Sequence, residues 1–158
     1  MPQHHFEIGV VVARKALNNA WADHAWQAHA VLPAAPGLAP GMPLGGDLFY
    51  AGACELALHS AATAHYRDNL SSGQPSLWIA LAPDAETCRV TAATADPYEG
   101  EALSEAVGGT VDRVAMPDPV RAALAAFVAA FHIERSFFKR TRDRADLELG
   151  RRPEWADK

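Results

Sequence analysis

Histidines are the first residues in this chain that could do chemistry, since there are seven of them in 158 residues. His24 and His29 are five positions apart, and His59 and His65 are six apart. Neither spacing is the i, i+4 arrangement by which two histidines on one helix clamp a metal ion. We therefore expect surface or hydrogen-bonded histidines and no native metal site.

Nucleophilic catalysis has no recognisable motif. The chain lacks a Gly-x-Ser-x-Gly turn, and neither Cys54 nor Cys88 has the local signature of an activated thiol. The carboxylates of Glu99 and Glu101 lie near an expected helix start, where solvated charge explains them. The sequence leaves enzyme activity open, and it favours a protein without catalysis.

Two short polar clusters could bind a small molecule. Asp23-His24-Ala25-Trp26 could form part of a ligand pocket or a tryptophan-rich turn packed on a sheet edge. Tyr66-Arg67-Asp68-Asn69 could hold an anionic group, or form a surface strand with an ion pair worth at most about 1 kcal/mol. The candidate ligand-binding residues are His24, Trp26, Tyr66 and Arg67.

A basic segment near the end of the chain could dock a partner. Four cations in six residues, next to two phenylalanines, would attract an acidic protein surface, an anionic cofactor or nucleic acid, or form a solvated extension. One such run without a basic fold behind it disfavours nucleic acid. The candidate docking residues are Phe137, Phe138, Lys139, Arg140, Arg142 and Arg144.

Charge divides the chain into two parts. The formal net charge is −5, but residues 133–158 hold eight of the fourteen Lys and Arg and six of the nineteen Asp and Glu. Residues 1–132 therefore carry −7 and the tail +2. We expect one β-rich globular domain over 1–132 and an extended or partly disordered basic tail over 133–158. No secretory signal or long apolar stretch is present, so we expect a cytoplasmic protein.

Hydrophobic patterning predicts strands through the first two thirds of the chain and an irregular, mobile loop over residues 33–46, which is rich in Pro and Gly. Residues 64–70 fit either a strand or a helix. The expected strands span residues 6–14, 25–32, 47–50, 54–59, 77–81 and 89–94, with Gly52 between the third and the fourth.

Two helices follow. Asp96 can cap a helix that starts at Pro97, with Glu99 in the capping-box position. A second helix, capped by Asp118, has one apolar face that must pack on the sheet: Val120, Leu124, Phe127, Val128 and Phe131. The fold class is α+β, a predominantly antiparallel sheet or small β-barrel with a short helix and a C-terminal amphipathic helix packed on it.

Several motifs identify a family. They include Asn19-Ala20-Trp21-Ala22-Asp23-His24-Ala25-Trp26, Tyr66-Arg67-Asp68-Asn69-Leu70, Pro75-Ser76-Leu77-Trp78-Ile79, Asp96-Pro97-Tyr98-Glu99 and Phe138-Lys139-Arg140. From about Ile8 to Arg142 the chain resembles the bacterial domain-of-unknown-function family 3305. The resemblance implies a gene beside formate dehydrogenases that carry a molybdenum or tungsten pterin cofactor. Some members also carry a label of molybdopterin-guanine dinucleotide biosynthesis.

A guanylyltransferase mechanism does not fit this sequence. Such an enzyme needs a glycine-rich loop after its first strand to hold the nucleotide phosphates, and here that strand is followed by Lys15-Ala16-Leu17-Asn18-Asn19. We expect instead an accessory protein for maturation or assembly of a molybdopterin-dependent formate dehydrogenase, which binds a dehydrogenase subunit. It would have no cofactor beyond a transient molybdopterin-type ligand. The alternative is a pterin- or nucleotide-binding protein, or an enzyme, of molybdenum cofactor biosynthesis.

Overall fold

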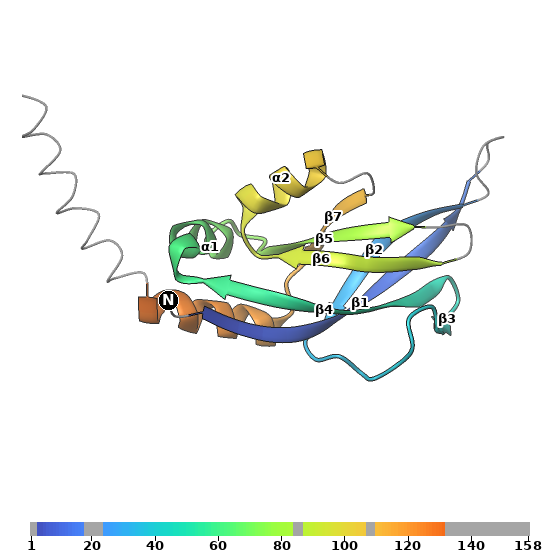
Figure 1. Cartoon of the computed structure of the whole chain (residues 1–158), viewed down its shortest axis with the longest axis horizontal. Coiled ribbons are helices and arrows are strands. Elements are labelled where there is room, and N and C mark those ends of the chain that lie inside the picture. The colour runs from blue at the N-terminus through green and yellow to red at the C-terminus, as the bar shows by residue number, and fades with distance from the viewer. Residues whose placement is uncertain (1–2, 18–23, 84–86, 107–109, 132–158) are drawn as a thin grey trace, which may run out of the picture.

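The computed structural model describes residues 3–17, 24–83, 87–106 and 110–131, which form two antiparallel sheets (Figure 1). The first has the order β2-β1-β4-β3 and the second the order β6-β5-β7. The strands are β1 Gln3–Ala16, β2 His24–Leu32, β3 Pro43–Gly45, β4 Leu48–His59, β5 Ser76–Pro83, β6 Cys88–Thr94 and β7 Thr110–Ala115.

Three α-helices accompany the sheets. α1 spans Thr63–Leu70 after a short 3-10 turn, Ser60–Ala62, and α2 spans Pro97–Ala106. The third covers residues 118–131. Over the described ranges the sheets do not close into a barrel, so the fold is α+β with mostly antiparallel sheet, as predicted. No helix in those ranges is long and apolar enough to cross a membrane.

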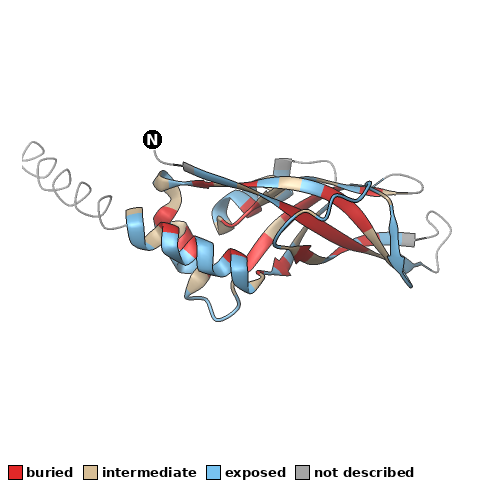
Figure 2. Cartoon of the chain, turned by 90° about the horizontal axis from the view of Figure 1, so that it is seen from below, coloured by how far each residue is buried: buried red, intermediate tan, exposed pale blue. Residues whose placement is uncertain are grey.

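The core lies between the two sheets and under the third helix (Figure 2). Alternate residues of β1 and β5 are fully buried, as the period of a strand requires. Each such side chain contributes about 1.5–3 kcal/mol on leaving water. The predicted apolar face of residues 118–131 is confirmed, since Val120, Leu124 and Phe127 are buried in this core. The alternate residues of β1 and β5 that are fully buried are Ile8, Val10, Val12, Leu77, Ile79 and Leu81.

A β-bulge keeps β4 continuous where two strands were predicted. The register on β1 passes from Gly52 to Tyr50, which leaves Ala51 as the extra residue. Gly52 has φ +111°, a value that a residue with a Cβ rarely adopts. A bulge bends a strand without ending it, so the glycine marks a bend and not a break between strands.

The proline-rich loop is bound to β4. The Gly41 N–H donates to the Tyr50 carbonyl at 2.7 Å, and the Tyr50 N–H donates to the Met42 carbonyl at 2.9 Å. Pro36 Cδ lies 3.1 Å from the position that a Cβ on Gly9 would occupy. The loop therefore runs along the β4 edge of the first sheet, where it includes β3, and its Pro36 lies over Gly9 of β1.

Other elements differ from the sequence expectations. Residues 64–70, which fitted either a strand or a helix, lie within α1. β7 was not predicted, because Asp112 and Arg113 interrupt its apolar pattern. Asp112 has a structural use, since its carboxylate accepts the Ala28 N–H at 2.8 Å and so links β7 to β2 in the other sheet.

Gly100 on α2 lies against the indole of Trp78 on β5. A Cβ at residue 100 would stand 2.4 Å from Trp78 Cγ and 2.7 Å from its Cδ1, closer than real Cβ atoms come. Only glycine lets the helix backbone approach the ring this closely.

We expect Gly100→Ala to lower the free energy of unfolding by about 1–3 kcal/mol, because the ring or the helix must move. Urea unfolding measures this cost. In a Trp78→Leu background the same substitution should cost much less, because the clashing ring is gone. An equal cost in both backgrounds would contradict the proposed contact.

Candidate functional site

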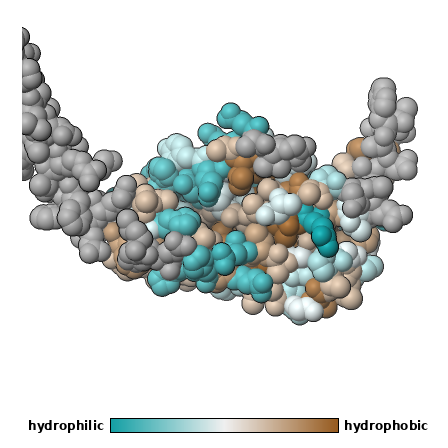
Figure 3. Space-filling model, in the orientation of Figure 1, coloured by the Kyte–Doolittle hydropathy of each residue, from teal (hydrophilic) through white to brown (hydrophobic). Residues whose placement is uncertain are grey.

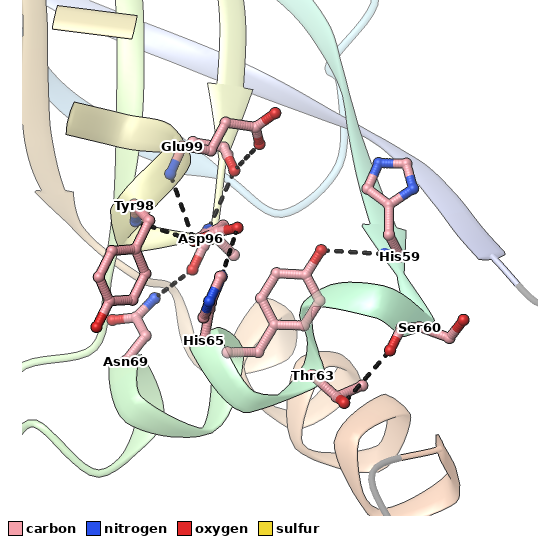
Figure 4. A network of polar contacts seen from close by, with 11 residues as sticks. His59, Ser60, Thr63, His65, Asn69, Asp96, Tyr98 and Glu99 are labelled. Atoms are coloured by element: carbon pink, nitrogen blue, oxygen red, sulfur yellow. Dashed lines mark hydrogen bonds and ion pairs between the residues drawn. The ribbon is translucent and has the colours of Figure 1, made fainter. Parts of the chain in front are cut away.

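The polar motif residues that define the candidate site gather where α1, α2 and the ends of β5 and β6 meet (Figure 4). Asn69 is central to this region and is only 2% exposed. Its Nδ2 donates to the carbonyls of Ser76 at 2.8 Å and Ala95 at 2.9 Å, and its Oδ1 accepts the Ser76 N–H at 3.0 Å. The amide therefore joins α1 to two strands and is not available to an anion.

Tyr66 is also used inside the fold. Its ring lies 6.2 Å from that of Phe127 on the third helix, and its hydroxyl oxygen accepts the His59 N–H at 3.0 Å. Burial raises the pKa of Tyr66, the carboxylates of Asp96 and Glu99 raise it further, and the bond from His59 opposes them. The side chain stabilises the end of β4 and is not exposed to a ligand.

Asp96 begins α2 as predicted. Its Oδ1 accepts the Tyr98 N–H at 2.9 Å and the Glu99 N–H at 3.4 Å. The Asp96 N–H donates at 3.0 Å to the hydroxyl of Thr94, which in turn donates to the Glu99 carboxylate. The capping box thus forms with one difference, since Glu99 reaches the cap through a threonine hydroxyl.

His65 completes the site and was not among the candidates from sequence. Its Nδ1 lies 3.0 Å from Asp96 Oδ2, and its ring centroid lies 4.4 Å from that of Tyr98. The Asp96 carboxylate at Nδ1 orients the imidazole, and the other ring nitrogen, Nε2, points away from that carboxylate. No described hydroxyl or thiol bonds to His65. The two partners are 31 positions apart, so no local pattern predicts their meeting.

Trp26 belongs to a different region. It is 9% exposed and packs edge-on against Phe49 at 5.5 Å, while the Arg14 guanidinium carbon lies 4.9 Å from the centre of the same Phe49 ring. This is core packing at the end of the first sheet. His24 precedes it on β2, opposite Ala16.

The four predicted ligand-binding residues do not meet in one pocket. Trp26 pairs with Arg14 of β1, whereas Tyr66 bonds to His59, which pairs with Gln3 at the other end of β1. Gln3 and Arg14 are eleven positions apart on β1, or about 35 Å along the strand. Arg67 is exposed on α1, beside Tyr66.

The predicted docking residues lie outside the described residues, as does the whole predicted tail over 133–158. Those residues are Phe137, Phe138, Lys139, Arg140, Arg142 and Arg144.

The described residues define a small α+β protein in which the polar motifs hold helices onto two antiparallel sheets. The chain belongs to the family described as protein of unknown function DUF3305, whose model matches residues 7–142. This match confirms the resemblance and extends into the basic segment. Comparisons with curated proteins and with solved structures found no match.

We expect Asn69→Asp to lower the free energy of unfolding by about 2–4 kcal/mol, because a carboxylate cannot donate to the two carbonyls. Asp68→Asn, at the exposed neighbouring position, should change it by less than about 0.5 kcal/mol. Chemical denaturation of both variants measures the difference. Similar effects at the two positions would contradict the structural role of the amide.

Alkaline pH should destabilise the protein through Tyr66. The folded state favours the neutral phenol, so the pKa of Tyr66 is higher in the folded protein than its ordinary value of 10.0. The contribution of this phenol to the free energy of unfolding is fully present below pH 10.0 and is lost as the pH rises through the higher folded-state pKa. Tyr66→Phe should be less stable by about 1 kcal/mol at neutral pH, because the His59 N–H loses its acceptor. Its unfolding free energy should also fall less steeply above about pH 10. Urea midpoints across this range test both effects, and parallel pH curves would contradict the second.

Proposed function

We propose that this protein is an accessory protein for maturation or assembly of a molybdopterin-dependent formate dehydrogenase, and that it acts by binding and not by catalysis. The observation that carries the proposal is the use of the motif residues within the fold. Tyr66 and Asn69 bond to backbone groups, and Trp26 lies in the core. What remains for function is the outer surface, which suits a protein that binds other proteins. The dehydrogenase comes from the family resemblance, and we place both proteins in the cytoplasm.

The docking arm in this proposal is the segment from Phe137 to Arg144. The helix before it is well anchored, since Phe127 contacts Tyr66 and His4, and Phe131 lies 6.1 Å from His4. The basic segment begins a few residues after this helix in the sequence. Its cations favour an acidic surface on the dehydrogenase subunit.

The alternative, a pterin- or nucleotide-binding protein or an enzyme of molybdenum cofactor biosynthesis, would need exposed side chains. Because Trp26 and Tyr66 are buried, such a ligand would have to use residues such as Arg67 and Tyr98 on the helices. Native mass spectrometry of the full chain from producing cells discriminates the two, since a bound pterin or nucleotide mass would support the alternative.

Copurification tests the accessory role. Full-length tagged protein should recover the catalytic subunit of the dehydrogenase from cells that produce both. Replacing Arg140, Arg142 and Arg144 by Gln should reduce recovery about tenfold, since each exposed ion pair contributes about 0.5 kcal/mol.

The matched control replaces the same three arginines by Lys, which keeps the charge and should keep most of the recovery. Equal recovery with the Gln variant would overturn the docking arm. Failure of the unmodified protein to recover any dehydrogenase subunit would overturn the accessory role itself.

A further inference from the structure

An aromatic pair on α1 and α2, His65 and Tyr98, is accessible to solvent. Tyr98 is 57% exposed, and its ring contacts that of His65 at a tilt of 49°. We propose that this helix face, centred on Tyr98 and His65, binds the basic segment 137–144 of the same chain. In this state the arm is held on its own domain and is unavailable to a partner.

Asp96 contacts both members of the pair, the His65 ring and the backbone N–H of Tyr98. Asp96 holds the His65 ring through Nδ1, and the same carboxylate caps α2 directly before Tyr98. A ring fixed in this way loses little conformational freedom on binding. An arginine guanidinium stacks well on an exposed tyrosine ring, and tyrosines of this kind dominate many interfaces.

Charge favours this segment as the occupant. α2 contributes Glu99, Glu101 and Glu105 and no Lys or Arg. On α1 the charges of Arg67 and Asp68 cancel. The surface over both helices is largely hydrophilic (Figure 3). The densest run of cations in the sequence is Lys139 to Arg144.

The third helix, which leads into the basic segment, packs against the buried side of α1, the helix that carries His65. Phe127 contacts Tyr66, the residue next to His65, so the third helix packs on α1 (Figure 4). Positions 131 and 137 are six residue steps apart in the sequence, a length of chain that can span about 20 Å. The width of one helix is about 10 Å, so this tether is long enough to cross α1 toward the face that carries Tyr98. A short tether raises the effective concentration of the segment to the millimolar range.

Limited tryptic cleavage of the full-length protein at low salt tests the proposal without any dehydrogenase. The variant combines Tyr98→Ala with Glu101→Gln and Glu105→Gln on the helix face. Cleavage after Arg140, Arg142 and Arg144 should be roughly tenfold faster in this variant than in the unmodified protein, because cleavage follows the population of the released segment. High salt should have a similar effect on the unmodified protein.

Two controls make the comparison specific. Cleavage after Arg151, in the same tail but outside the segment, should proceed at the same rate in both proteins. Glu7→Gln with Glu55→Gln, which removes two exposed charges from β1 and β4, should leave cleavage after Arg140 unchanged. If Tyr98→Ala unfolds the protein, the variant that carries only Glu101→Gln and Glu105→Gln serves for the same comparison.

Equal cleavage rates in the helix-face variant and the unmodified protein would overturn the proposal. Protection that increases with protein concentration would also overturn it, since the occupant would then be the segment of a second copy. Neither outcome bears on the accessory role, because the experiment contains only this chain.

Discussion

The buried amide of Asn69 is the interaction on which the arrangement of the helices depends. It bonds to both backbone groups of Ser76 and to the carbonyl of Ala95, so one side chain sets α1 against the start of β5 and the end of β6. Asp96 follows Ala95 directly and caps α2. Asn69 therefore also sets the start of α2 close to α1 in space, where His65 can reach Asp96.

Among the residues that the structure describes, side chains join the two sheets, and no continuous ladder of hydrogen bonds does so. The core residues between them supply most of the stability through apolar burial, which has no preferred direction. The relative placement of the two sheets and of α2 comes from a few specific contacts. Asp112 bonds to the backbone of Ala28 in the other sheet, and Gly100 lets α2 approach Trp78. These contacts fix the relative positions of layers that hydrophobic burial alone would leave free to slide.

Within the described part of the chain, the family motif residues Tyr66, Asn69 and Asp96 have structural roles. Tyr66, Asn69 and Asp96 all have backbone partners inside the protein. By bonding to the backbone, these polar residues hold in place the helices whose outer faces form the surface. On α1 and α2 that surface presents His65 and Tyr98, and the basic arm follows the third helix in sequence. Both proposals place function on these outer elements.

Local chemistry determined much of this protein from sequence alone. The strands alternate by side-chain burial, Asp96 caps its helix, and the apolar stripe of residues 118–131 faces the core, because each depends on neighbours a few positions away. Only the tertiary structure decided that Tyr66 and Asn69 face backbone groups and that His65 meets Asp96. Their partners come from other elements, and the sheet order and layer packing that bring them together are not encoded in any short stretch of sequence.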